Sequence, residues 1–172
     1  MDIKKKVFIY FRFSSEIGYG HLSRARALLE ILKNDFDVKL LTTSNTNEET
    51  LEDQIVFFPD VKKMLAHVEK QESSILIVDD YKAIDDQKLD LLWARKDLSG
   101  QKLVFVIDYE KRPYNVDLIL SPTGAQATLN SKVKSFTWPE YSLVSQFFST
   151  KKPEIFQQSA LWCALVEQIL LE

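Results

Sequence analysis

The stretch SSEIGYGHLSRARALLEILK, residues 14–33, decides the fold because it turns a strand into a helix. Before it, VFIYF at residues 7–11 is a run of β-branched and aromatic residues, which is typical of a strand buried on both faces. Apolar residues within the stretch recur at spacings of three, four and three, which predicts one apolar stripe on a helix: Leu22, Ala25, Leu29 and Leu32. We therefore expect a strand, a glycine turn and a helix.

The predicted turn holds Gly18 and Gly20 on either side of Tyr19. Glycine permits a positive φ angle, or a close approach of the backbone to a ligand, at little steric cost. His21 follows in the first turn of the helix, where unpaired N–H groups and the positive end of the dipole favour a neutral imidazole and an anionic ligand. A neutral imidazole can accept a proton, which makes His21 a candidate base. The alternative is that the glycines form only a tight turn and that His21 caps it.

Arg24 follows His21 by three residues in the first turn of the same predicted helix. A cation in the first turn opposes the helix dipole, so Arg24 needs a partner. That partner is either an acidic side chain or a substrate anion, and a structural salt bridge is the simpler of the two uses.

The remaining chain alternates strands with helices. This alternation predicts a parallel sheet covered by helices on both faces. The expected strands are residues 36–43, 55–58, 74–81, 102–108 and 116–121. The expected helices are residues 61–68, capped by Asp60, and 84–98, ended by Gly100.

Acidic residues and a phenol follow two of these strands. Asp79, Asp80 and Tyr81 end the strand at 74–81, and Asp108 ends the next one. Ligands bind at the carboxyl ends of strands in open α/β sheets. Adjacent carboxylates on extended backbone point in opposite directions, so Asp79 and Asp80 are not automatically an acid/base pair. The alternative is that one of them caps the next helix while the other is solvated, and for Asp108 packing or capping is the simpler role.

The segment GYGHLSR, residues 18–24, resembles the G-x-G-H-x-x-R signature of the UDP-sugar hydrolases of pseudaminic acid biosynthesis. These enzymes are relatives of MurG-like glycosyltransferases with the GT-B fold. The resemblance implies that His21 is a general base that activates water against a nucleotide-linked sugar. It also implies that Arg24, Gly18 and Gly20 contact the substrate.

The same resemblance extends to the sheet edge. Asp79 and Tyr81 match the D-x-Y pattern of the family. The match implies that Asp79 binds substrate and that Tyr81 is a catalytic residue whose hydroxyl contacts the sugar. Asp108 resembles the aspartate that ends the next strand in the family, which implies a substrate-binding role. Tyr109 stands where the family usually has a second acid.

The resemblance covers roughly residues 5–145 and implies a Rossmann-like domain, the N-terminal half of a GT-B fold. We expect residues 1–145 to form this domain and residues 146–172 to form a linker and an amphipathic helix. The glycine-rich half that holds most of the contacts to UDP in such proteins is expected to be missing, because no glycine follows Phe148.

Two functions of different class follow. In the first, the chain is the sugar side of a UDP-amino-sugar hydrolase or glycosyltransferase, with the nucleotide site supplied by a missing half or another polypeptide. In the second, it is a non-catalytic partner or binding subunit of a split GT-B enzyme. In either case the terminal helix would dock a second GT-B half or a second copy of the chain.

The sequence lacks the residues that metal sites, Ser-His-Asp hydrolases and NAD-binding sites require. His21 and His67 are the only histidines and no C-x-x-C occurs, so no metal site is expected. A G-x-S-x-G elbow is absent, which disfavours a Ser-His-Asp hydrolase. Ser23 stands where G-x-G-x-x-G needs its last glycine, which disfavours NAD; no cofactor is expected.

Composition limits the partners and the compartment. The net charge of −3 gives no reason to expect a nucleic-acid partner. No run reaches the roughly 18 apolar residues that a membrane span requires, and the first residues lack a signal-peptide cleavage pattern. The single Cys163 suits a reducing compartment, so we expect a cytoplasmic protein.

Overall fold

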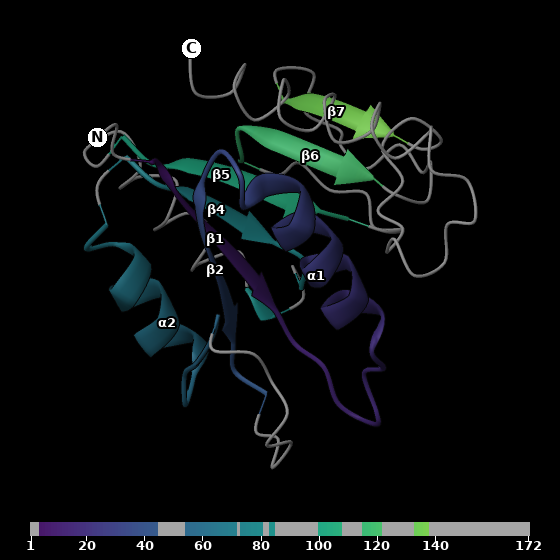
Figure 1. Cartoon of the computed structure of the whole chain (residues 1–172). Helices are drawn as coiled ribbons and strands as arrows, with labels where there is room; N and C mark the ends of the chain where they lie inside the picture. The colour runs from purple at the N-terminus through teal and green to yellow at the C-terminus, as the bar shows by residue number, and fades with distance from the viewer. Residues whose placement is uncertain are drawn as a thin grey trace.

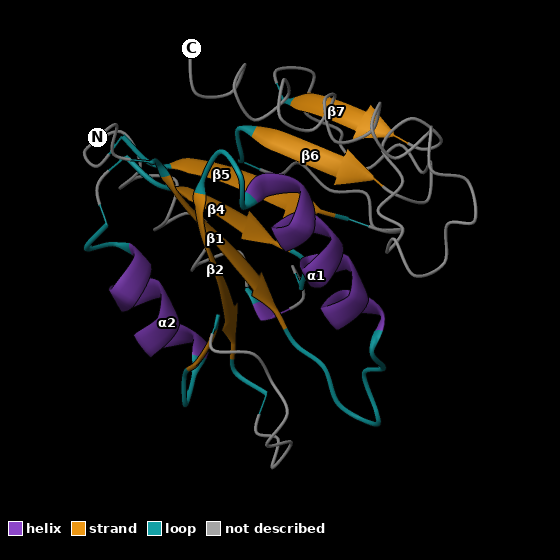
Figure 2. Ribbon diagram, in the orientation of Figure 1, coloured by secondary structure: helices purple, strands orange, loops and turns teal. Residues whose placement is uncertain are grey.

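The computed structural model describes residues 4–44, 54–71, 73–80, 83–84, 100–107, 115–121 and 133–137. Its centre is a seven-stranded sheet in the order β3-β2-β1-β4-β5-β6-β7, in which every pair of neighbours is parallel (Figures 1 and 2). The strands are β1 Lys6–Phe11, β2 Asp37–Thr42, β3 Ile55–Phe57, β4 Ile75–Val78, β5 Lys102–Val106, β6 Leu118–Ser121 and β7 Lys134–Thr137. The predicted α/β fold class with a parallel sheet is confirmed.

The strand order reverses direction at β1. Strands β2 and β3 lie on one side of β1, whereas β4 and the later strands lie on the other side. Ile9 at the centre of β1 pairs with Leu40 of β2 and with Ile77 of β4. In sheets of this kind the crevice outside the carboxyl ends of the strands at the reversal is the usual binding position. The fold therefore directs attention to the ends of β1 and β4.

Helix α1, Gly20–Leu32, covers one face of the sheet. Alternate residues of β1 point to this face, as expected for extended backbone: Val7, Ile9 and Phe11. The buried stripe of the helix meets them and matches the predicted one: Leu22, Ala25, Leu28, Leu29 and Leu32. Each fully buried leucine contributes about 1.5–3 kcal/mol, so this contact fixes the position of the helix firmly.

Helix α2, Val61–Val68, covers the opposite face. Its N-terminus is capped as predicted, because Oδ1 of Asp60 accepts a hydrogen bond from the Lys63 N–H at 2.7 Å. Met64, Leu65 and Val68 of this helix pack with the other set of β1 side chains. Helices thus lie on both faces of the sheet, as predicted.

His67 of α2 is exposed and lies off the apolar stripe of that helix. Its ring packs near the rings of Phe8 and Phe58, at centroid distances of 6.0 and 5.3 Å. It lies on the face opposite α1, away from the predicted site.

One strand was not predicted, and several predicted features lie outside the described residues. Strand β7 was not predicted, because Lys134–Thr137 reads KSFT and lacks an apolar run. The predicted helix 84–98, apart from Ile84, the domain boundary at 145/146 and the terminal helix in 146–172 lie outside the described residues. Within the described ranges, no helix is long and apolar enough to cross a membrane.

Candidate functional site

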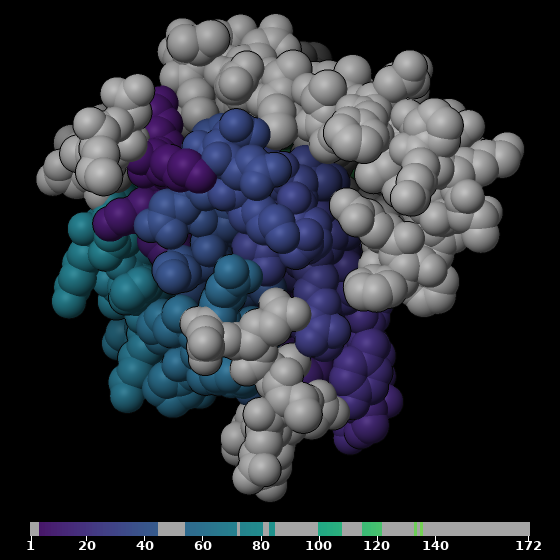
Figure 3. Space-filling model, in the orientation of Figure 1, coloured from purple at the N-terminus to yellow at the C-terminus, as the bar shows by residue number. Residues whose placement is uncertain are grey.

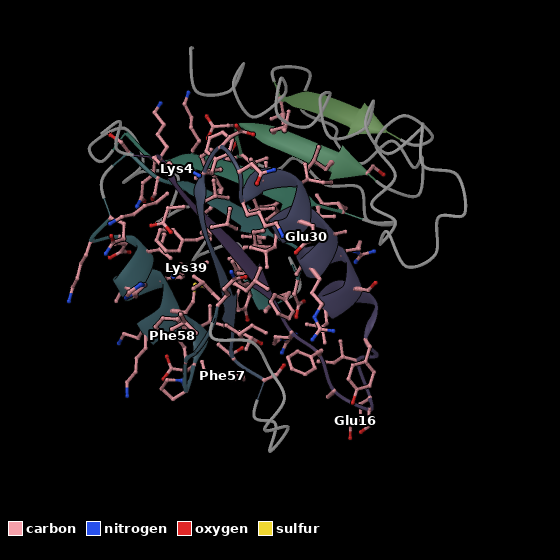
Figure 4. The ribbon with its side chains drawn as sticks, viewed as in Figure 1. Lys4, Glu16, Glu30, Lys39, Phe57 and Phe58 are labelled. Atoms are coloured by element: carbon pink, nitrogen blue, oxygen red, sulfur yellow. The ribbon has the colours of Figure 1, made fainter. Side chains whose placement is uncertain are left out.

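The loop that joins β1 to α1, residues 12–19, forms one wall of the candidate site. It projects beyond the carboxyl edge of the sheet (Figures 1 and 3). Figure 4 shows Glu16 of this loop at the same edge as Phe57 and Phe58, whereas Lys4 lies at the opposite edge. The predicted turn between strand and helix is therefore found at the carboxyl edge of the sheet, where ligands usually bind in open α/β sheets.

Hydrogen bonds within the loop fix its shape. The Gly18 N–H donates to the Ser14 carbonyl at 2.8 Å. The Ser14 hydroxyl accepts from the N–H groups of Glu16 and Ile17 at 3.2 and 3.0 Å. Gly18 has a φ of +87°, a conformation that favours glycine and that explains this residue in the turn.

Gly20 differs from Gly18 because nothing in the described part of the structure requires a glycine there. Its φ is not positive, and a Cβ added there would meet nothing within 4 Å, so neither backbone conformation nor packing demands a glycine. The first turn of α1 also has no acidic residue, and no side chain caps it at Tyr19. The N–H groups at the start of α1, beside the imidazole of His21, therefore receive no cap from the Tyr19 side chain.

A buried carboxylate meets that helix end from the sheet. Asp79 follows β4, is 0% exposed, and donates its backbone N–H to the Tyr10 carbonyl at 2.8 Å. Nε of Arg24 donates to its Oδ2 at 3.0 Å, and Nη2 of Arg24 lies 2.9 Å from Oδ1. Nδ1 of His21 lies 3.3 Å from the same Oδ1. We call His21, Arg24 and Asp79 the imidazole cluster.

The two residues that α1 contributes to the imidazole cluster lie on the same side of the helix. His21 and Arg24 are three residues apart, a spacing that brings two side chains together on an α-helix. Nη2 of Arg24 lies 2.9 Å from Nδ1 of His21. Arg24 thus has an acidic partner in Asp79, one of the two partners considered for it.

The pKa of His21 shifts in the direction opposite to the one that a helix N-terminus favours. The contact with Asp79 raises the pKa of His21, whereas burial and the neighbouring Arg24 oppose that rise. We expected the helix dipole to favour the neutral ring, but the pKa of His21 is raised because the contact with Asp79 outweighs that effect. A helix end carries about half a unit charge, while Asp79 offers a carboxylate in contact with the ring. Burial raises the pKa of Asp79 itself, and the contacts with His21 and Arg24 oppose it.

The second carboxylate, Asp80, has a separate partner. It is 5% exposed, and its Oδ2 accepts a hydrogen bond from Nε of Arg12, the first residue after β1. The alternative in which one of the two aspartates is solvated is wrong, because both are buried and ion-paired. Sequence reasoning missed Arg12, although a lone cation directly after a buried strand was a usable signal.

The neighbouring edge of the site is held by hydroxyl groups. The Tyr10 hydroxyl and the Thr43 hydroxyl lie 3.0 Å apart, and Ser44 Oγ accepts from the Phe13 N–H at 2.7 Å. Burial raises the pKa of Tyr10, so its hydroxyl stays protonated and acts as a structural link between β1 and the end of β2.

Other predicted residues are not placed by the structure. Tyr81 and Asp108 lie outside the described residues. Within the residues that are described, no group of three or more His, Cys, Asp or Glu side chains could hold a metal ion. Gly18, Gly20, His21, Arg24 and Asp79 do come together, around the start of α1 and the end of β4.

Comparisons with known proteins add no family to this geometry. No protein-family model, curated protein or solved structure matches the chain. Fold and site define a class only: a parallel α/β protein that presents an imidazole, paired with a buried carboxylate, at the reversal of its strand order.

Proposed function

We propose that the chain is the sugar-side half of a GT-B nucleotide-sugar hydrolase or glycosyltransferase, acting on a UDP-linked amino sugar, with His21 as general base. One observation carries the proposal: the imidazole of His21 contacts the buried Asp79 beside an uncapped helix start, at the strand-order reversal. The UDP-sugar substrate comes from the resemblance of residues 18–24 to the hydrolase signature.

The charge balance of the site supports a model in which this half binds the sugar and a second half binds the diphosphate. The charges of Arg12 and Arg24 are matched by those of Asp80 and Asp79. With His21 neutral, these five groups carry no net charge, so they offer no surplus cation to a diphosphate. The diphosphate would be neutralised by a second half, and this half would supply the proton acceptor and a surface for the sugar.

The reaction would use His21 at the sugar. In hydrolysis, the ring takes a proton from water while the water oxygen attacks the anomeric carbon. The bond from that carbon to the UDP oxygen breaks, and UDP leaves with the bonding electrons. In glycosyl transfer, a hydroxyl of the acceptor replaces water. Gly18 and Gly20 leave the backbone open to the sugar, and Tyr81 is proposed to contact it.

The test is release of UDP from UDP-linked amino sugars. The purified chain is assayed alone and together with a separately purified nucleotide-binding half of a GT-B enzyme. Because a general base contributes about 10²–10⁴ in rate, we expect His21→Ala to lower UDP release by that factor. His67→Ala is the matched control, since His67 is exposed on the opposite face of the sheet, and we expect it to retain full activity.

Two outcomes would overturn the proposal. UDP release that survives His21→Ala would remove His21 as the base. Absence of release with every sugar and pairing would reject an enzyme half and favour the non-catalytic subunit of a split GT-B enzyme. Tight binding of the second half without turnover would identify that subunit directly.

A further inference from the structure

We propose that Asp79 is a positioning residue that, against the competing contact with Arg24, places the proton of the neutral His21 ring on Nδ1 and leaves Nε2 as the proton acceptor. The catalytic use of this arrangement rests on the proposed function. The position of the proton itself can be measured without any substrate. The family resemblance implied that Asp79 and Arg24 bind substrate. In the structure both residues contact the imidazole of His21.

Two neighbours compete for Nδ1. Oδ1 of Asp79 lies 3.3 Å away, and Nη2 of Arg24 lies 2.9 Å away. A carboxylate only accepts hydrogen bonds and a guanidinium only donates them. Nδ1 therefore either carries a proton and donates to Asp79, or lacks one and accepts from Arg24. The first state leaves Nε2 free to take a proton, and the second state places a proton on Nε2.

The needs of the Asp79 carboxylate decide between the two states. Oδ2 already accepts the aligned hydrogen bond from Nε of Arg24 at 3.0 Å. Oδ1 is buried, and within the described part of the chain no aligned hydrogen bond reaches it: neither Nη2 of Arg24 at 2.9 Å nor Nδ1 of His21 at 3.3 Å points a proton at it. Leaving a buried charged oxygen without a donor costs more than one hydrogen bond gains. An N–H on Nδ1 of His21 meets that need after a small rotation of the ring.

The other charges near the ring do not reverse this preference. Asp80 lies beside the cluster but is paired with Arg12. Arg24 repels a charged ring, yet it keeps its hydrogen bond to Asp79 in either state of the imidazole. Asp79 therefore stays the dominant neighbour of Nδ1.

The remaining nitrogen is available for chemistry. Within the described residues no hydrogen bond engages Nε2, and the His21 side chain is 21% exposed. When Nε2 takes the proton of water, the ring becomes an imidazolium whose Nδ1–H still points at Asp79. The charge that forms is thus met by a carboxylate that is already in place, with no rearrangement during the step.

Nitrogen NMR of the full chain tests the inference. The sequence has only two histidines, so ¹⁵N-histidine labelling gives two imidazole patterns, and His67→Gln assigns them. At a pH above the titration of the rings, we expect the His21 pattern of a ring protonated at Nδ1. A His21 pattern protonated at Nε2 would overturn the proposal, because it would mean that Arg24 donates to Nδ1.

Two matched carboxylate variants sharpen the test. Asp79→Asn keeps the size of the side chain but removes the charge, and we expect it to abolish the preference for Nδ1 and to lower the titration midpoint of His21. Asp80→Asn, one residue away, is expected to leave the tautomer unchanged. Equal effects of both variants would contradict a specific role for Asp79. Should Asp79→Asn fail to fold, the wild-type tautomer decides alone.

Kinetics separates this inference from the proposed function. Where UDP release is found, Asp79→Asn is expected to lower kcat on the order of 10- to 100-fold, part of what a base supplies, with little change in KM. A ring protonated at Nδ1 without any UDP release would reject the proposed function only. Release that depends on His21, with the proton on Nε2, would reject the positioning role only.

Discussion

Asp79 and Asp80 are neighbours in sequence and have the same side chain, yet they occupy unlike surroundings. Asp79 turns toward α1 and meets Arg24 and His21, and its side chain is 0% exposed. Asp80 pairs with Arg12, whose side chain is 35% exposed. The difference teaches that, because successive side chains alternate at a strand end, one carboxylate can face a histidine while the next forms an ion pair elsewhere.

The largest expected difference between the two is in stability. Asp79→Ala leaves Arg24, which is 18% exposed, without its carboxylate, and we expect a loss of about 3–5 kcal/mol in the free energy of unfolding. Asp80→Ala leaves Arg12 able to reach water, and we expect a loss of about 1 kcal/mol. Urea unfolding followed by circular dichroism measures both. Equal losses would break the contrast between the two carboxylates.

A smaller effect is expected from the loop that connects the two ion-paired groups. Residues 12–19 begin with the partner of Asp80 and end two residues before His21. Gly18→Ala forces a side chain into a φ of +87°, and we expect it to cost about 1–2 kcal/mol in unfolding free energy. Gly20→Ala is the control: it meets open space at an ordinary φ and should leave stability unchanged or slightly higher. A larger loss in Gly20→Ala than in Gly18→Ala would contradict the fixed turn.

Local patterns predicted most of the described fold. Continuous apolar runs identified β1, β4 and β5, the 3.6-residue stripe identified α1, and Asp60 marked the start of α2. The edge strand β7 was missed because only one of its four residues is apolar, so its strand character depends on pairing with β6.

The site was predictable only in part, for a different reason. The G-x-G-H-x-x-R pattern is local, and it correctly placed His21 and Arg24 at the start of a helix. Their partner Asp79 is 55 residues from Arg24, and Arg12 is 68 residues from Asp80. Which carboxylate faces which cation depends on the crossover that sets β4 beside β1, and no local pattern records that. The raised pKa of His21 was not predicted, because the helix dipole is a local property while Asp79 is distant in sequence.

The smallest expected effect is on the pH dependence of stability. The pKa of His21 is raised in the folded chain, mainly by Asp79. The pairing therefore contributes stability in full below the ordinary histidine value of about 6.5 and loses it as the pH rises through the folded value. The unfolding free energy of the wild type minus that of His21→Gln should shrink from pH 6 to pH 9. A difference that grows over this range would contradict the contact with Asp79.

The most direct test of the imidazole cluster is the titration of His21 in the folded wild-type chain, followed by NMR and compared with the same residue in the chain unfolded by urea. A midpoint above that of the unfolded chain is the predicted result, because a carboxylate in contact favours the imidazolium. A midpoint at or below the unfolded value would mean that the ring does not pair with Asp79, and the proposed base would lose its partner.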